Sequence, residues 1–264
     1  MARIHIIHGA YPIDRHPAVR KIRMSDLKEA LARGIDDFAA MPTHAVFLCL
    51  IYPILGVVLA GMAFGYSVLP LLYPLMAGFA LIGPIAALGL YELSRRRERG
   101  LDCFWTHAFD ITQTPNFGAI AALGVVLLAI FVGWVATAQF IYEQIFGPQP
   151  PESITAFIDQ IFTTRDGWML IVVGNGVGFL FALLVLSISV VSFPLLLDRD
   201  VGAVEAAATS VRAVAANPMT MAAWGLIVAV LLVLGSLPLF LGLAVVMPVL
   251  GHATWHLYRK VVAR

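Results

Sequence analysis

The fold is decided by long stretches without an ionisable side chain, the clearest of which, residues 167–197, reads GWMLIVVGNGVGFLFALLVLSISVVSFPLLL. A helix needs about 20 such residues to cross the hydrocarbon core of a bilayer. Residues 38–91, 111–142 and 213–258 likewise contain no Asp, Glu, Lys or Arg. Hydrophobic residues make up 60% of the chain and charged residues 12%, whereas soluble domains are about half apolar and a quarter charged. We therefore expect an all-α, polytopic membrane bundle, because lipid offers the backbone no other hydrogen-bond partners.

These four stretches predict six membrane spans. Residues 111–142 and 167–197 are long enough for one span each, whereas 38–91 and 213–258 are each long enough for two. Both of the longer stretches are interrupted by a turn that contains proline, which ends or kinks a helix. The expected spans are residues 43–65, 70–92, 117–142, 168–197, 219–236 and 238–258.

The basic residues predict the orientation of the chain. With six spans, all of the 17 Lys and Arg residues except Arg165 lie on one side, and the positive-inside rule assigns that side to the cytoplasm. Residues 143–166 are then a periplasmic insertion. No apolar core of a signal peptide precedes Lys21. We expect a bacterial inner-membrane protein with a cytoplasmic tail, residues 1–24, and a single integral membrane domain, residues 25–264.

Three segments of the chain look like copies of one another. Each has apolar residues at helical spacing and is closed by a proline directly before an apolar run: residues 26–42, 100–115 and 202–218. This pattern predicts amphipathic helices on the cytoplasmic face, with the proline at the corner where the chain enters the membrane. The predicted repeat units, each a surface helix followed by two spans, are residues 25–92, 100–197 and 202–258. Such repeats occur in transporters and in non-transporting scaffolds, and we favour the scaffold interpretation.

Charged residues gather where two of the predicted spans end. They are Arg95, Arg96, Arg97 and Arg99 after the second span, and Asp198 and Arg199 after the fourth. A basic residue beside anionic headgroups contributes about 1 kcal/mol, so we interpret these side chains as lipid contacts. A docking site for a cytoplasmic partner is the alternative.

Small residues mark the fourth predicted span. Gly174 and Gly178 form a small-xxx-small face that permits close helix packing, and Asn175 between them is expected to hydrogen bond across helices or to line a polar cavity. The run is not a nucleotide-binding loop, because no phosphate-binding Lys follows it. We therefore assign these three residues to helix packing.

Four histidines are candidate metal or haem ligands on the cytoplasmic side: His44, His107, His252 and His256. The last two are four residues apart and share a helix face, and imidazole is a common ligand of zinc and iron. The zinc-protease motif fails because Ala253 follows the first of the pair. We favour a different interpretation, in which both imidazoles lie at the headgroup level with Trp255 and Tyr258 and anchor the helix. No metal or cofactor is therefore predicted, although haem and metal are left open.

The sequence contains no paired catalytic side chains and no cofactor motif, so we do not expect an enzyme. No predicted span carries a charged residue at its centre, where ion-coupled carriers usually keep one. Two functions remain: a non-catalytic protein that binds or helps assemble another membrane complex, and a channel or carrier for a small solute. The expected partners are the lipid bilayer and either another membrane complex or a second copy, and no nucleic acid.

The C-terminal third resembles a known family. The residues that carry the likeness are 192–201, Asn217-Pro218 and the stretch Gly251-His252-Ala253-Thr254-Trp255-His256. They are similar to a bacterial integral-membrane family that has only a domain-of-unknown-function label, some members of which are labelled putative cytochrome c oxidase subunits. The resemblance implies a proteobacterial-type inner-membrane protein and no activity. Because the histidines of this chain map near one surface, the oxidase label would imply an accessory subunit or assembly factor.

Overall fold

The computed structural model describes residues 17–41, 69–238 and 240–263, and its regular elements are helices. In chain order they are α1 (Met24–Ala40), α4 (Leu69–Ala86), α5 (Leu88–Glu98), the 3-10 helix η1 (Trp105–Gln113), α6 (Phe117–Phe146), α7 (Ile154–Thr163), α8 (Arg165–Ser189), α9 (Ser192–Asp198), α10 (Ala203–Ala216), α11 (Pro218–Ser236) and α12 (Leu243–Val261). The prediction of an all-α bundle is confirmed.

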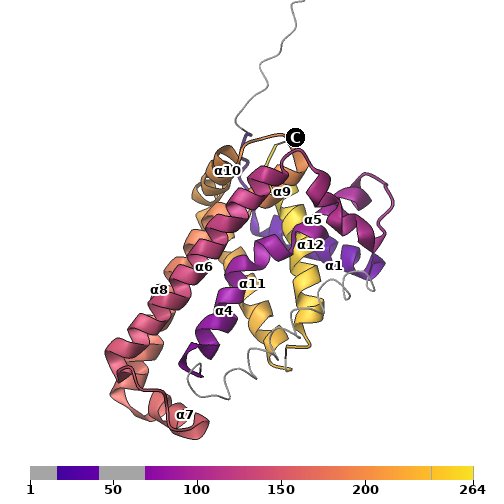
Figure 1. Ribbon diagram of the computed structural model, residues 1–264. Coiled ribbons are helices and arrows are strands. Elements are labelled where there is room, and N and C mark those ends of the chain that lie inside the picture. The colour runs from indigo at the N-terminus through magenta and orange to yellow at the C-terminus, as the bar shows by residue number, and fades with distance from the viewer. Residues whose placement is uncertain (1–16, 42–68, 239, 264) are drawn as a thin grey trace, which may run out of the picture.

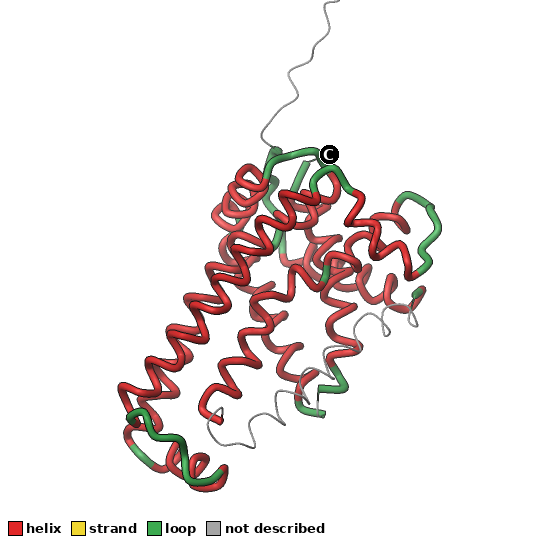
Figure 2. Tube along the Cα trace, in the orientation of Figure 1, coloured by secondary structure: helices red, strands yellow, loops and turns green. Residues whose placement is uncertain are grey.

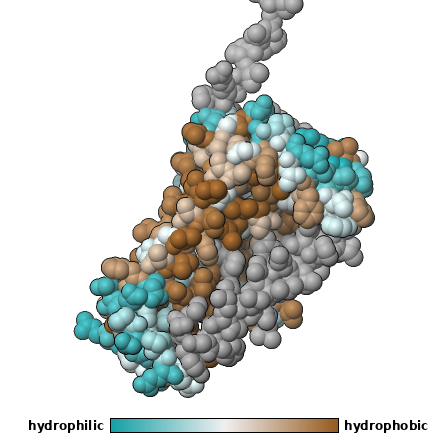
Figure 3. Space-filling model, in the orientation of Figure 1, coloured by the Kyte–Doolittle hydropathy of each residue, from teal (hydrophilic) through white to brown (hydrophobic). Residues whose placement is uncertain are grey.

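The long helices run between two polar ends. Helix α6 leads to α7 at one end and α8 returns beside it, whereas α1, α5, η1, α9 and the C-terminus gather at the other end (Figures 1 and 2). We call these the α7 end and the basic end. Figure 3 shows apolar surface between hydrophilic caps, and large apolar side chains such as Val132, Phe179 and Val233 are exposed there. A large exposed apolar surface of this kind is unfavourable in water and favourable against the acyl chains of a bilayer.

Helices long and apolar enough to cross a membrane are fewer in the described part of the chain than the sequence predicts. They are α6, the continuous stretch Arg165–Asp198 that contains α8 and α9, and α11. Helix α4 adds a fourth if Leu69–Gly78 and Ala80–Ala86, bent by 41°, form one span. The predicted span 43–65 lies outside the described residues. The count of six therefore stays a prediction.

The predicted sixth span, residues 238–258, overlaps α12, which is not among the helices that could cross a membrane. Helix α12 is long enough but not apolar enough to qualify, because its second half contains His252, His256, Arg259 and Lys260. Most of the side chains in this half are buried in the protein rather than exposed to lipid. Helix α12 is therefore better described as a core helix of the basic end.

A tryptophan packs into the bend of α4. The Trp134 indole of α6 donates to the Pro74 carbonyl at 2.8 Å. The indole lies between two glycines: a Cβ on Gly78 would come within 3.0 Å of Trp134 Cδ1, and one on Gly178 within 2.9 Å of Cη2. The absence of side chains at both positions thus lets α4, α6 and α8 close around one large aromatic ring.

The three segments before the corner prolines differ in local structure. Helix α1 ends at Ala40, and α10 ends at Ala216, two residues before Pro218, the first residue of α11. Proline suits this position because the first helical N–H groups have no intrahelical acceptor. The segment before Pro115 is the 3-10 helix η1 instead of the expected α-helix. The threefold repeat remains a prediction.

Residues just before α1 belong to the packed structure, although the sequence assigned them to the tail. The Arg20 N–H donates to the Val261 carbonyl at 2.7 Å, and the Ala263 N–H donates to the Ala18 carbonyl at 2.9 Å. The Asn217 side chain accepts from the Ile22 N–H at 2.8 Å. These bonds tie the segment before α1 to the C-terminal residues and to the α10–α11 corner.

Candidate functional site

A polar cluster that is buried except for its arginine joins three helices at the basic end. We call it the Asp37 cluster, and its members are Asp37 of α1, Ser94 and Arg97 of α5, and His252 and His256 of α12. The Asp37 carboxylate accepts from the Ser94 hydroxyl at 2.5 Å and from His256 Nε2 at 2.9 Å. Arg97 forms an ion pair with its second oxygen. His252 Nδ1 lies 2.7 Å from the Ser94 hydroxyl oxygen.

Two glycines bring these helices close enough for the cluster to form. A Cβ on Gly34 of α1 would lie 2.7 Å from both the backbone nitrogen and the Cβ of Ala253 on α12. A Cβ on Gly251 would lie 2.6 Å from a methyl carbon of Leu90 on α5. Because the backbones approach this closely, short side chains such as Asp37 and Ser94 reach across the helix interfaces.

The electrostatics of the cluster depend on the charge of Asp37. Burial raises the pKa of this carboxyl, but hydrogen bonds from His256 and Ser94 and the nearby imidazoles outweigh burial and lower the pKa to about 2. The carboxylate is therefore ionised at neutral pH. A carboxylate that accepts several hydrogen bonds in a protein interior is held in its charged form.

The proton positions follow from the single proton of the Ser94 hydroxyl. Because that proton is donated to Asp37, the Nδ1–H of His252 donates to the Ser94 oxygen. His252 Nε2 is buried and has no hydrogen-bond partner within the described residues. Ser94 is itself buried and bonded at both sides, so its oxygen is not presented to a substrate. The arrangement acts as a cross-link between helices.

A second group of charges lies beside the first. We call it the Glu98–Asp198 cluster, after the two carboxylates that α12 bridges. Arg259 donates to Asp198 at 2.9 Å and pairs with Glu98 at 3.1 Å. Trp255 donates to Glu98 at 3.1 Å, and Tyr258 donates to Asp198 at 2.8 Å. This cluster fastens α12 to the ends of α5 and α9.

The arginine run lies in ion pairs within the chain. Arg95 pairs with buried Glu92 at 2.8 Å, Arg96 with Asp110 at 3.3 Å, Arg97 with Asp37, and Arg99 with Asp198 at 3.2 Å. Arg199 donates to the Ala263 carbonyl. Arg95 and Arg96 are largely covered by the protein, and the lipid or partner contact of the run stays a prediction. Sequence reasoning missed these pairs because most of the acidic partners are distant along the chain.

The headgroup interpretation of the histidine pair is corrected. His252, Trp255 and Tyr258 are buried inside the protein, and His256 is nearly so, so none of them contacts headgroups as an anchor does. His107 is separate from the pair, because it contacts Asp102 and Asp110 beside η1. His44 lies outside the described residues. Within the described ranges no group of three or more His, Cys, Asp or Glu side chains is arranged to hold a metal ion.

The three residues assigned to helix packing have different surroundings. Gly178 contacts Trp134, whereas Gly174 has no neighbour within 4 Å of the position a Cβ would take. The Asn175 carbonyl oxygen accepts from the Tyr73 hydroxyl at 2.7 Å, and its amide nitrogen donates to the Ile171 carbonyl at 2.8 Å. Asn175 therefore forms a cross-helix bond between α8 and α4.

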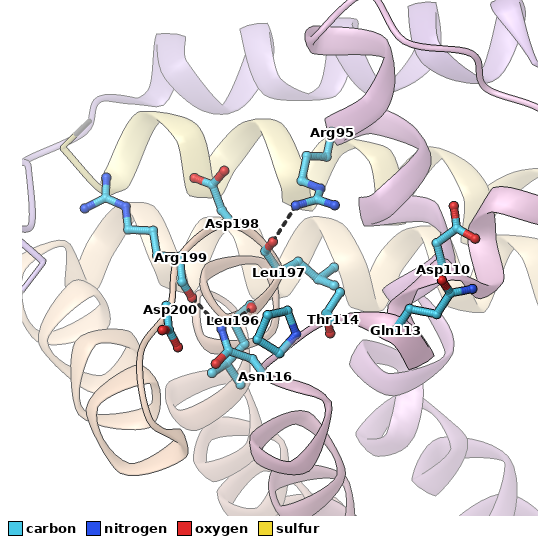
Figure 4. A pocket seen from close by; sticks show the side chains of 11 residues that line it. Arg95, Asp110, Gln113, Thr114, Asn116, Leu196, Leu197, Asp198, Arg199 and Asp200 are labelled. Atoms are coloured by element: carbon cyan, nitrogen blue, oxygen red, sulfur yellow. Dashed lines mark hydrogen bonds between the residues drawn. The ribbon is translucent and has the colours of Figure 1, made fainter.

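A shallow hollow opens at the basic end, beside the Glu98–Asp198 cluster. It has a volume of about 390 Å³ and is lined by η1, the start of α6 and the end of α9, with Arg95 on its rim (Figure 4). Asn116 closes its floor by donating to the carbonyls of Leu196 and Arg199 at 3.0 and 2.7 Å. A second hollow, of about 330 Å³, lies at the α7 end beside Tyr142 and Phe157. Both are open depressions at the polar ends.

Comparison with known proteins relates part of the chain to a family of membrane proteins. No curated protein and no solved structure matches it. Residues 71–198, which run from α4 to the end of α9, match a family model described as "Predicted integral membrane protein (DUF2189)". This stretch contains α6, α8 and the arginine run, together with the two carboxylates of the Glu98–Asp198 cluster. Residues 71–198 of the chain are thus similar to a family of predicted integral membrane proteins of unknown function.

Proposed function

We propose that the protein is a non-catalytic membrane protein that binds, or helps to assemble, another membrane complex. The observation that supports this proposal is the network of ion pairs between helices at the basic end. Charged side chains at this end form ion pairs with one another in the Asp37 and Glu98–Asp198 clusters, and these pairs join α1, α5, α9 and α12. Buried polar networks of this kind favour one arrangement of helices over others. The result is a rigid platform.

The platform presents an apolar surface suited to a protein partner. Leu101, Phe104 and Phe109 are exposed in and beside η1, and Trp105 contacts both phenylalanine rings. Aromatic residues are enriched at protein interfaces. We call these four residues the η1 patch and propose that the partner docks there. The label of the resembling family suggests a respiratory complex as the partner class, and a second copy of the chain is the alternative.

We further propose that the basic end faces the cytoplasm of a bacterial inner membrane. Among the described residues, Arg165 is the one basic side chain at the α7 end, and the others belong to elements of the basic end. Retention of Lys and Arg on the cytoplasmic side is the usual bias of inner-membrane proteins. The charge distribution supports this orientation, which a reporter fused after Arg264 would test.

The proposal is tested by purifying the protein from native membranes in mild detergent and identifying what accompanies it. Phe109→Ser should remove the accompanying complex, whereas Phe162→Ser should not. The two side chains are 55% and 59% exposed and lie at opposite ends of the molecule. Equal recovery of a complex with both variants, or no complex at all, would contradict the proposal. So would stoichiometric haem or zinc that is lost in His252→Ala.

A channel or carrier for a small solute is the second candidate. The observation that favours it is the Tyr73–Asn175 hydrogen bond, a polar pair within the apolar belt. Polar side chains in such positions often mark solute pathways. Uptake of neutral solutes by proteoliposomes should then fall in Asn175→Ala but not in Ser187→Ala. Ser187 is the matched control because it is also exposed on α8 and bonds only to a carbonyl of its own helix.

A further inference from the structure

Helix α10 is buried on one side and carries exposed valines on the opposite side. Its inner side is buried against the bundle through Ala206, Thr209, Ser210 and Ala213. Its outer side nevertheless carries Val204, which is 85% exposed, and Val211, which is 45% exposed. A helix between a protein core and water normally carries charged or polar residues on the outer side. The composition of α10 therefore indicates that its outer side does not face water.

The charges of α10 do not change this conclusion. Arg212 is the exposed charged residue of the helix, and it pairs with Glu205 at 2.6 Å. The same guanidinium donates to the Thr209 hydroxyl at 2.8 Å. The outer side is therefore close to neutral, so an attraction to charged surfaces does not account for it.

The exposed apolar residues of α10 continue onto a membrane-crossing helix. We call this series the outer row: Val204, Val211, Met219, Leu226, Val230 and Val233, all exposed. The spacing is seven residues within α10 and seven, four and three residues within α11, so each group lies along one side of its own helix, and the two groups meet at the corner at Pro218. Helix α11 is one of the helices long and apolar enough to cross a membrane. The row is thus continuous with a surface that acyl chains cover.

The corner between α10 and α11 is held in place by side chains. Asn217 accepts from the Ile22 N–H and donates to the Arg20 carbonyl at 3.0 Å. The Thr220 hydroxyl donates to the Ile22 carbonyl at 3.3 Å. Because these bonds fix the corner, α10 is not free to turn its outer side away from the surface that α11 presents to lipid.

We propose that the outer side of α10 is a lipid-contact surface, embedded in the leaflet at the basic end. Val204 and Val211 lie among the acyl chains, and the Arg212–Glu205 pair lies at the headgroup level, where a long basic side chain reaches polar surroundings. Apolar burial drives this contact, so it does not depend on anionic lipid. The contact between α10 and the acyl chains thereby sets how deeply the basic end lies in the membrane.

The test measures the surroundings of single labelled positions in the full chain. Cys49 and Cys103 are replaced by Ser, and a nitrobenzoxadiazole fluorophore is attached to Val204→Cys or Val211→Cys in phosphatidylcholine vesicles. Brominated lipids should quench both labels about as strongly as a label at Val132→Cys, which is exposed in the belt on α6. Aqueous iodide should quench them much less than a label at Asp102→Cys, whose side chain is 75% exposed.

Two results would overturn the proposal. If iodide quenches the α10 labels as strongly as the label at position 102 and brominated lipids do not, the outer side faces water and is free for a protein partner. If lipid quenching appears only with anionic lipid and disappears at high salt, charge and not apolar burial holds the helix at the surface. Unchanged lipid quenching in neutral vesicles and at high salt is the expected result.

Discussion

His256 Nε2 donates to the Asp37 carboxylate at 2.9 Å, although the two residues are 219 positions apart in the chain. This bond joins the first described helix to the last. Both side chains are largely shielded from solvent, so the interaction is not weakened by water as a surface ion pair is. Around it, Ser94, Arg97 and His252 complete a polar core within the basic end.

Replacing Asp37 by Asn should destabilise the protein strongly. The substitution keeps the shape but removes the charge that Arg97 and His256 surround. Breaking a buried ion pair by removing one partner costs about 3–5 kcal/mol. Thermal unfolding in detergent measures the effect, and Asp36→Asn is the control because Asp36 is the exposed neighbour. Equal melting temperatures for the two variants would refute a structural role for the cluster.

The contribution of Asp37 should disappear in acid. Its pKa is lowered from the ordinary 3.8 to about 2 in the folded protein. A lowered pKa means that the stabilisation is present above about pH 4 and is lost as the pH falls towards 2. The difference in melting temperature between the unmodified protein and Asp37→Asn should therefore be constant from pH 7 to 5 and shrink below pH 4. A difference that stays the same at pH 3 would exclude ionised Asp37 as its source.

Gly34→Ala should separate α1 from α12. The added methyl group would lie 2.7 Å from the Ala253 backbone nitrogen, and backbone cannot yield as a flexible side chain does. Overpacking of this kind costs about 1–3 kcal/mol. Gly118→Ala in α6 is the control, since no atom lies within 4 Å of its Cβ position. We expect a lower melting temperature for Gly34→Ala alone. A lower melting temperature for Gly118→Ala than for Gly34→Ala would show that α1 and α12 are not tightly packed at Gly34.

Asn217→Ala should release the segment before α1. The substitution leaves the buried N–H of Ile22 without its acceptor and removes the bond to the Arg20 carbonyl. An unsatisfied buried group costs about 1–3 kcal/mol. Trypsin should then cleave after Arg20 and Lys21 faster than in the unmodified protein. The control is Ser236→Ala, which removes only a bond within α11. Equal cleavage rates in the two variants would show that the asparagine does not hold the segment.

Local patterns in the sequence predict the helices of the apolar belt well. Helices α6 and α11 begin within two residues of the expected spans, because the length of a charge-free run and the proline at its start both act locally. The end of α10 before Pro218 was predictable for the same reason. Such signals depend only on neighbouring residues.

The candidate site was much less predictable. The sequence indicated the shared face of His252 and His256, but not their acceptor, because nothing near them in the chain points to Asp37. For the arginine run the sequence predicts a lipid surface and gives no sign of the ion pairs, because most of the acidic partners come from α1, α9 and η1. The sequence predicts a span over most of α12 because residues 213–258 contain no ionised side chain. The polar residues His252, Thr254 and His256 in this helix are instead buried in the protein core. Tertiary contacts decide all three cases.

The most direct test of the account is a double-mutant cycle on the first and last described helices. The free energy of unfolding is measured in mixed detergent micelles for Asp37→Asn, His256→Phe and the double variant. If the buried pair joins α1 to α12, the effects should be non-additive by at least about 1 kcal/mol, as for residues in one hydrogen-bond network. Strictly additive effects would contradict the claim that this pair holds the basic end together.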